Sequence, residues 1–207
     1  MITRDLRTLE RRDAYRVLSS LVVPRPIAWV TTVGGNGTVN LAPFSSFMGI
    51  FNPPMVGINF GRRRDGSLKD THLNLRERRE AVVHLADASL LRLVHASGEE
   101  VPPETSELAA LGLETSPSEA VNPPRITAAP VALECRLRQE VPLDERSTLA
   151  LCDVLVAHAA DRIWDNALDC ARADLWEPVV RLVGGVGNGP NYARLGERIT
   201  LEKPRLP

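Results

Sequence analysis

Residues 21–47 read LVVPRPIAWVTTVGGNGTVNLAPFSSF, and this stretch decides the fold class. Its first part, Leu21–Val33, is rich in Val, Ile, Trp and Thr, which favour extended chain, and its two prolines confine strand pairing to the part after Pro26. The glycine-rich turn at 34–37 is followed by a second extended run, TVNLAPF. The stretch therefore predicts a β-hairpin.

The rest of the chain continues mainly as short strands. PPMVGINF (53–60) and AVVHLADA (81–88) each predict a strand, and the alternating runs at 131–141 and 148–160 predict a strand pair. A helical lead-in is expected over residues 1–20, a short helix at 69–80, and an irregular or helical turn at 165–176. Residues 97–124 form a Pro- and Glu-rich excursion, with one short helix that Gly112 ends. These features predict one domain over residues 1–207, mainly β with helical additions, as a barrel or a sandwich.

The composition is that of an ordinary globular protein. Of the 207 residues 43% are apolar and 25% charged, and the net charge of −1 gives no general attraction to nucleic acid or to an anionic membrane. No stretch approaches the roughly 20 apolar residues of a membrane helix, and the N-terminus does not resemble a secretory signal. Cys135, Cys152 and Cys170 are widely spaced, so neither a disulfide framework nor a metal site is expected. We expect a cytoplasmic protein.

The residues that suggest chemistry lie between positions 25 and 74. In NLAPFSSF, the polar residues Asn40, Ser45 and Ser46 stand beside small or rigid Ala42 and Pro43. Such a strand edge admits a flat heterocycle, and the two hydroxyls could face a phosphate. The alternative is ordinary turn chemistry at a strand end.

A complementary anion site is suggested one strand and one loop later. Lys69 and Thr71 flank the start of the helix expected at 69–80, where free N–H groups favour an anion, and arginines occupy positions 62–64. The alternative is a simple N-cap at Asp70 or Thr71 beside a surface lysine.

Five segments in this order carry a family resemblance: RPIAWVTT, NLAPFSSF, PPMVGINF, DGSLKDTHLN and RLVGG. Between Tyr15 and Tyr192 the chain resembles the flavin-reductase-like family of FMN-binding split β-barrels. That family includes the reductase components of two-component monooxygenases and the flavoredoxins. The resemblance implies an FMN-binding split β-barrel that forms a homodimer with the flavin near the interface.

The resemblance also implies the cofactor-binding residues. Thr31 and Thr32 would lie near the flavin ring, with Asn40, Leu41, Ala42 and Pro43 along its polar edge. Ser45, Ser46, Lys69 and Thr71 would hold the ribityl phosphate. It assigns no catalytic side chain and no metal.

The implied function is that of an NAD(P)H:flavin oxidoreductase, in which a hydride passes from the nicotinamide to flavin N5. The flavin is FMN, with FAD as the alternative, and a monooxygenase or another electron acceptor would be the partner. Two other functions stay open, an FMN-bound electron carrier and a non-catalytic flavin-binding protein. The residues do not distinguish NADH from NADPH.

The segment GGVGNGPNY, 184–192, departs from the family pattern GG-x-x-Y and has no histidine. Its glycines loosely suggest a dinucleotide loop, but the following helix and acidic residue are missing, which argues against a Rossmann site. Elsewhere, His84 and His158 are expected to be core or sheet residues, and His72 is expected on a helix surface.

Overall fold

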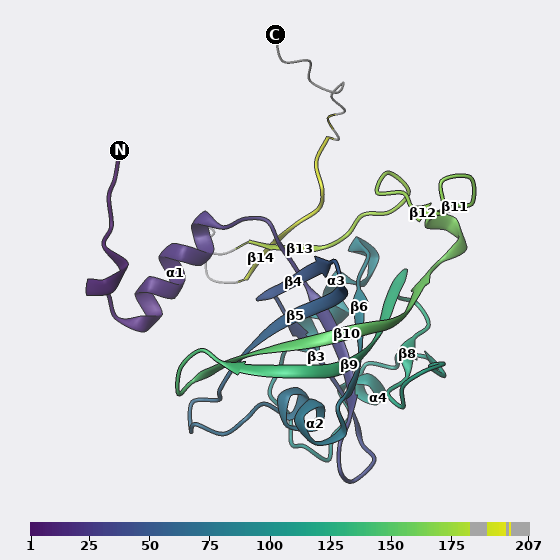
Figure 1. The fold of residues 1–207 in the computed structure, drawn as a ribbon, viewed down its shortest axis with the longest axis horizontal. Coiled ribbons are helices and arrows are strands. Elements are labelled where there is room, and N and C mark those ends of the chain that lie inside the picture. Colours follow the sequence, from purple (N-terminus) through teal and green to yellow (C-terminus); the bar gives the residue numbers. More distant parts are fainter. Residues whose placement is uncertain (183–189, 198, 200–207) are drawn as a thin grey trace.

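A single antiparallel sheet of seven strands organises the computed structural model, which describes residues 1–182, 190–197 and 199 (Figure 1). In the order in which they pair, the strands are β3 (Val39–Phe44), β2 (Ala28–Val33), β6 (Glu80–Leu85), β9 (Val131–Pro142), β10 (Ser147–Ala159), β5 (Pro54–Gly61) and β4 (Phe47–Phe51). The predicted hairpin is confirmed, because Ala28–Val33 pairs with Val39–Phe44 around the turn at 34–37. The predicted pairing of 131–141 with 148–160 is confirmed by β9 and β10.

The sheet is rolled but not closed. Its two edge strands, β3 and β4, are consecutive in the sequence and are joined only by Ser45 and Ser46. Three residue steps span at most about 11 Å, so the two edges must approach each other at this point. Among the described residues no ladder of hydrogen bonds joins β3 to β4. The two serines therefore mark the split in the barrel.

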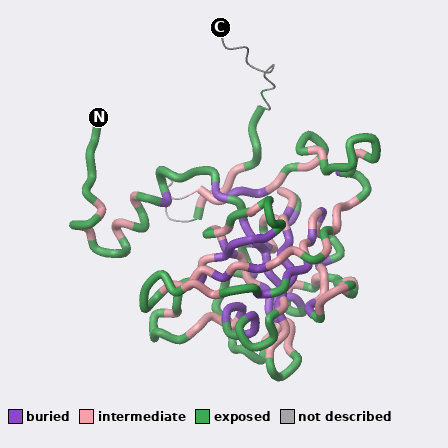
Figure 2. Tube along the Cα trace, in the orientation of Figure 1, coloured by how far each residue is buried: buried purple, intermediate pink, exposed green. Residues whose placement is uncertain are grey.

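Alternation along the strands builds two cores, one on each face of the sheet. Inside the roll, Val30, Ile58 and Phe60 belong to one buried cluster. On the outer face, Trp29 and Leu41 belong to the other. Figure 2 shows this burial concentrated in the rolled sheet. Cys135 and Cys152 are free thiols buried in the core inside the roll, whereas the free thiol of Cys170 is exposed.

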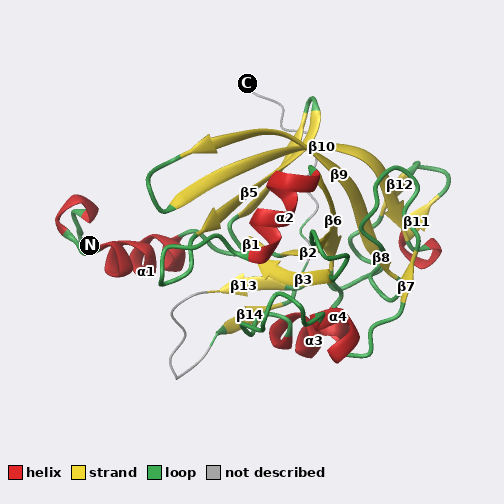
Figure 3. Cartoon of the chain, turned by 90° about the horizontal axis from the view of Figure 1, so that it is seen from below, coloured by secondary structure: helices red, strands yellow, loops and turns green. Residues whose placement is uncertain are grey.

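Helices cover the two faces unequally. Helix α2 (Asp70–Arg78) lies within the curve of the sheet, whereas α3 (Leu91–Ala96) and α4 (Glu107–Ala110) lie beyond β3 (Figure 3). Helix α4 also covers part of the β3 edge. The Ser106 hydroxyl donates to the Val39 carbonyl at 2.6 Å, and the Glu107 carboxylate accepts the Leu41 N–H at 2.9 Å. Burial raises the pKa of Glu107.

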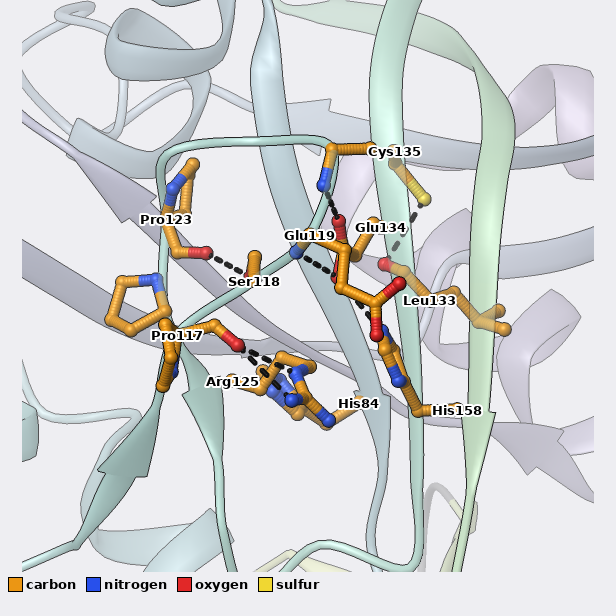
Figure 4. Close-up of polar contacts among 12 residues, drawn as sticks. His84, Pro117, Ser118, Glu119, Pro123, Arg125, Leu133, Glu134, Cys135 and His158 are labelled. Atoms are coloured by element: carbon orange, nitrogen blue, oxygen red, sulfur yellow. Dashed lines mark hydrogen bonds and ion pairs between the residues drawn. The ribbon is translucent and has the colours of Figure 1, made fainter.

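The return limb of the excursion, residues 117–126, is fastened to the sheet by side chains; we call it the strap. Glu134, which has no exposed surface, accepts the backbone N–H groups of Glu119 and Ala120 at 2.8 and 2.5 Å (Figure 4). The same carboxylate contacts Nε2 of His158 at 2.7 Å. Thr31 adds a hydrogen bond to the Pro124 carbonyl. These contacts satisfy backbone groups that lack a strand partner.

His84 fixes the end of the strap from inside the sheet. Its Nε2 accepts the Ile126 N–H and its Nδ1 donates to the Trp29 carbonyl, both at 2.9 Å. The contact with Ile126 requires neutral imidazole, because only an unprotonated Nε2 can accept a hydrogen bond. Burial lowers the pKa of His84 to about 4. The predicted core role of His84 and the sheet role of His158 are confirmed.

Replacing His84 with glutamine is expected to remove one source of acid instability. The folded-state pKa lies below the unfolded value, so stability is lost as the pH falls from about 6.5 to 4. Between pH 7 and 4 the wild type should lose about 2–3 kcal/mol more than His84→Gln. Urea unfolding at a series of pH values measures this difference, and parallel profiles for the two proteins would show that His84 does not contribute.

Outside the sheet, helix α1 (Arg11–Leu21) projects from the body and joins it through the strand β1 (Arg25–Pro26) (Figure 1). Strand β1 pairs with β13 (Val180–Leu182), which pairs with β14 (Asn191–Ala193). The remaining short elements are η1 (Leu6–Thr8), η2 (Ala88–Leu90), η3 (Asp161–Ile163), β7 (Thr115–Ser116), β8 (Arg125–Ile126), β11 (Trp164–Asp165) and β12 (Cys170–Ala171). None of the described helices has the length and apolarity needed to cross a membrane.

Most sequence predictions of individual elements are confirmed, and the mainly β fold with helical additions is among them. The helix that Gly112 ends is α4, and Gly112 has φ +63°. Strand β4 and helix α3 were not predicted. The surface position expected for His72 is wrong, because its side chain is 2% exposed, stacks on Phe60 and contacts Glu140 at 2.5 Å.

Candidate functional site

A cleft of about 900 Å³ opens where the barrel is split. This volume lies within the roughly 300–1,000 Å³ that is typical of small-molecule sites. Ser45 and Ser46 line it together with the end of β3, the start of α2 and the α1 helix. Among the described residues, five cations line it, and only one acid, Glu99, does so; the cations are Arg11, Arg12, Lys69, Arg146 and Arg181. The cleft therefore suits an anionic ligand.

Two residues at this cleft carry buried polar atoms without a partner among the described residues: Asn59 lines the cleft, and Arg25 contacts Ser45, which lines it. Arg25 is 9% exposed, and its Nη1 donates to the Ser45 hydroxyl at 3.0 Å, while its Nε and Nη2 have no partner. Oδ1 of Asn59, a cleft residue on β5, is also buried and unsatisfied. Buried donors and acceptors are rarely left unpaired. The Arg25 nitrogens require acceptors and Asn59 Oδ1 requires a donor, so a ligand that satisfies both residues must offer acceptors as well as donors.

The start of α2 supplies a second anion-binding feature. Lys69 occupies the N-cap, and its side chain makes no capping hydrogen bond, which leaves the first N–H groups of the helix without a side-chain acceptor. Nζ of Lys69 lies 5.6 Å from the centre of the Phe44 ring. Lys69 and Thr71 share a smaller pocket with Pro43 and Arg63, beside the main cleft. Arg63 forms an ion pair with Asp70, so Lys69 is the cation that remains for a ligand among the described residues of this pocket.

Beneath Lys69 lies a buried polar network. The Asn40 amide donates to Thr71 Oγ1 at 2.8 Å and to Thr32 Oγ1 at 3.5 Å. Asn74 donates to the same Thr32 oxygen at 3.1 Å. Thr32 is completely buried and Thr71 is 1% exposed. The network joins the β2–β3 hairpin to α2 and so fixes the position of the helix start.

The sequence-predicted site residues separate into three groups. Ser45 and Ser46 line the larger cleft, and Asn40, Ala42 and Thr71 line the smaller pocket, while Pro43 and Lys69 line both. Thr31, Thr32 and Leu41 line neither and have no exposed surface. The hydroxyl of Thr31 and the N–H of Leu41 are already bonded within the protein. The role of each as a flavin contact stays a prediction.

Part of the cleft lining comes from distant parts of the chain, which the sequence did not bring together. Tyr192 on β14 contacts Nδ1 of His95 on α3 at 3.1 Å through its hydroxyl. The guanidinium carbon of Arg181 lies 4.9 Å from the centre of the Tyr192 ring. All three side chains line the larger cleft. Of the segment GGVGNGPNY, the residues 184–189 lie outside the described part of the chain.

Arg25, His95 and Arg181 were missed because no local motif marks them. Arg25 stands in RPIAWVTT, a segment that carries the family resemblance, but neither the residues nor the resemblance assigned it a role. His95 faces Tyr192 only because β14 returns to α3, at a separation of 97 residues. Within the described residues, no group of three or more His, Cys, Asp or Glu side chains is arranged to hold a metal ion.

Comparison with known protein families agrees with this geometry. Residues 19–172 match the family described as flavin reductase like domain, and this match covers the split and most of the cleft. The chain belongs to this family. Family membership assigns it a flavin-related redox function.

Solved structures of similar chains extend the match to almost the full length. Nitrilotriacetate monooxygenase component B from Bacillus cereus has 30% identity and a TM-score of 0.89, over 97% of this chain and 98% of that one. The 2-nitrobenzoate 2-nitroreductase NbaA from Pseudomonas fluorescens has 29% identity and a TM-score of 0.87, over 98% and 96%. A flavin reductase with a split barrel domain from Shewanella frigidimarina has 16% identity and a TM-score of 0.76, over 96% of each chain. The last match shows the fold alone, and it confirms the split barrel.

Proposed function

We propose that this chain binds FMN in the cleft at the split and reduces it with NAD(P)H. The observation that carries the proposal is a cationic cleft of suitable volume, with unpartnered buried polar atoms on Asn59 in its lining and on Arg25, which contacts the lining residue Ser45. FMN carries a phosphate, ring carbonyls and ring and ribityl donors, so it can satisfy both kinds of atom. Membership of the flavin reductase like family supports the flavin as the ligand.

Different residues of the site would hold different parts of FMN. Lys69 and the first N–H groups of α2 would bind the phosphate, because full charge and the helix dipole act together there. Pro43, which lines both pockets, and Ala42, which lines the smaller one, are small or rigid residues against which a flat ring could lie. Asn59 Oδ1 would accept an N–H or O–H of the ligand.

When bound, FMN supplies the hydride acceptor at N5, and the nicotinamide supplies the hydride. The protein binds the two ligands and orients them for hydride transfer. Neither binding nor orientation requires a side chain that moves a proton. Tyr192 and His95 hold each other in place at the cleft wall, where they would limit how the second ligand stacks. The proposed roles therefore include no nucleophile and no general base.

The direct test follows the visible spectrum of the purified protein with added FMN, before and after NADH or NADPH is added. Loss of both the nicotinamide and the flavin absorbance, faster than with FMN alone, is the expected result. A flavin that binds tightly but stays oxidised with both donors would instead favour the electron carrier. Unchanged flavin absorbance and no binding would overturn the proposal.

We also propose that the chain forms a homodimer in which α1 contacts a second copy. The helix projects from the body (Figure 1), and its apolar side chains Leu18 and Leu21 are 52% and 72% exposed. On the edge strand β4, Phe51 is 92% exposed. Because Arg11 and Tyr15 of α1 also line the cleft, such a dimer would bring the flavin close to the interface.

Replacing both Leu18 and Leu21 with glutamate is expected to convert the dimer into a monomer, since charge opposes burial of this face. Light scattering after size exclusion gives the mass. The control is Arg16→Glu on the same helix, where the dimer should persist. A wild-type monomer at all concentrations would contradict the proposal.

For the acceptor of the reduced flavin we propose a monooxygenase. The similar protein from Bacillus cereus is component B of a nitrilotriacetate monooxygenase, and this likeness supports an acceptor of the same class.

A further inference from the structure

A further pocket, of about 260 Å³, lies at the base of the strap; we call it the strap pocket. Its lining comes from β7 and β8, the start of β9 and the end of β10. It shares no lining residue with the larger cleft or with the smaller pocket beside Lys69. Its volume lies just below the range typical of small-molecule sites, so it suits a small ligand.

Arg125 on β8 gives this pocket a cation without an acidic partner. The side chain is half-buried, and no ion pair within the described part of the chain includes it. Its Nε and Nη2 both donate to the Pro117 carbonyl, at 3.1 and 3.0 Å, which fixes the plane of the guanidinium (Figure 4). Nη1 and the second hydrogen of Nη2 form the other edge of the group. Two N–H groups on such an edge match the two oxygens of a carboxylate.

A hydroxyl pair lies on the same side of the β7–β8 pair as Arg125. Ser116 on β7 is the direct antiparallel partner of Arg125, and side chains of directly opposed residues lie on one face. The hydroxyls of Ser116 and Thr127 contact each other at 2.9 Å. Since one of them donates to the other, one hydroxyl hydrogen of the pair is left for a ligand.

The rest of the lining is apolar apart from His158, and none of the described residues that line the pocket is acidic. The ionised Glu134 carboxylate only accepts hydrogen bonds, so the hydrogen that it shares with His158 lies on Nε2 of the imidazole. This contact fixes the ring of His158 at the pocket. The apolar lining residues are Ile126, Ala129, Pro130, Ala132, Ala159 and Ala160.

We infer that the strap pocket binds a small monocarboxylate with an apolar body. Arg125 pairs with the carboxylate, the hydroxyl pair of Ser116 and Thr127 donates one hydrogen bond to it, and the alanine-rich wall contacts the body. An inorganic anion would use the donors but leave the apolar wall uncovered. The inference does not depend on the proposed flavin chemistry, because the two sites have no residue in common.

The experiment titrates the protein with benzoate and follows the backbone N–H signals by NMR. The signals of Ile126 and Thr127 should shift, because both residues line the pocket. Benzamide has the same shape without the charge, so it should bind at least about tenfold more weakly. The affinity for benzoate should be the same within about twofold with and without FMN.

Three variants test the assigned groups. Arg125→Gln should weaken benzoate binding by about tenfold or more, because a paired, charge-assisted contact is lost. Ser116→Ala combined with Thr127→Val should weaken it by about threefold or more, and this variant keeps Arg125 and its contact with Pro117. Arg136→Gln is the matched control and should leave the affinity within about twofold of wild type. Arg136 also donates to a carbonyl of the strap, that of Ala120 at 3.4 Å, but does not line the pocket.

Unchanged benzoate affinity in Arg125→Gln overturns the inference, and the double variant decides in the same way where Arg125→Gln does not fold. Absence of benzoate binding, or equal binding of benzamide, also overturns it. Loss of benzoate binding when FMN is added would place benzoate in the cleft and overturn it as well. If FMN itself does not bind, the proposed function fails while the shifts at Ile126 and Thr127 still support the strap pocket.

Discussion

Replacing Glu134 with leucine is expected to destabilise the folded protein by about 3–5 kcal/mol. The carboxylate has no exposed surface and is the acceptor for the N–H groups of Glu119 and Ala120 as well as a partner of His158. Burial acts to raise the pKa of Glu134, but these donors outweigh it and hold the pKa below its ordinary value. The stabilisation is therefore present above the ordinary pKa of a carboxyl and is lost as the pH falls through the lower folded-state value. Urea unfolding at pH 7 measures the loss.

A second carboxylate that holds the same strap from the sheet gives the control. Glu80 accepts the N–H of Asn122 at 2.9 Å and pairs with Arg136 at 3.4 Å, but its side chain is 23% exposed. Glu80→Gln should cost less than about 1 kcal/mol, because water can replace the lost contacts. Similar costs for Glu80→Gln and Glu134→Leu would show that burial of Glu134 does not set its contribution.

Replacing Lys69 with alanine is expected to weaken FMN binding by about 10- to 100-fold. The substitution removes a charge-assisted contact to the phosphate but leaves the helix N–H groups in place, so binding is reduced rather than abolished. Ser45→Ala combined with Ser46→Ala should act in the same direction. Quenching of flavin fluorescence during titration gives the dissociation constant.

Arg64→Ala is the matched control for Lys69→Ala. Arg64 is an exposed cation in the preceding loop and lines neither the larger cleft nor the smaller pocket. Its removal should leave FMN affinity within about twofold of wild type, because exposed charges are screened. If Lys69→Ala and the double serine variant both fold and bind FMN with unchanged affinity, the phosphate lies elsewhere in the cleft.

The hairpin, the paired long strands and the end of α4 were predictable because their signals are local. Alternation, a glycine-rich turn and a glycine with positive φ each act within a few residues. Strand β4 was missed because its short apolar run follows a polar Ser-Ser pair and does not alternate. His72 was misplaced because a helix so rich in charge suggests an exposed element, whereas α2 lies inside the roll and turns His72 toward Phe60.

The candidate site shows the same division between local and distant information. Ser45, Ser46 and Lys69 were found because NLAPFSSF and KDT are contiguous motifs, and all three line the cleft. Arg25 and Arg181 were not found, because they are 156 positions apart and meet only through the β1–β13 pair. A single sequence contains no signal for such a pairing. Likewise, nothing local shows that α4 already occupies the N–H of Leu41.

The distribution of thiols determines how this protein responds to alkylating reagents. Burial raises the pKa of both Cys135 and Cys152, that of Cys152 to about 12, whereas Cys170 is exposed. Because the thiolate is the reactive form, a maleimide at neutral pH should label Cys170 selectively and leave the folded barrel with one probe. The two interior thiols react only when the sheet opens. Their slow modification therefore measures the opening rate of the barrel in native buffer, without denaturant.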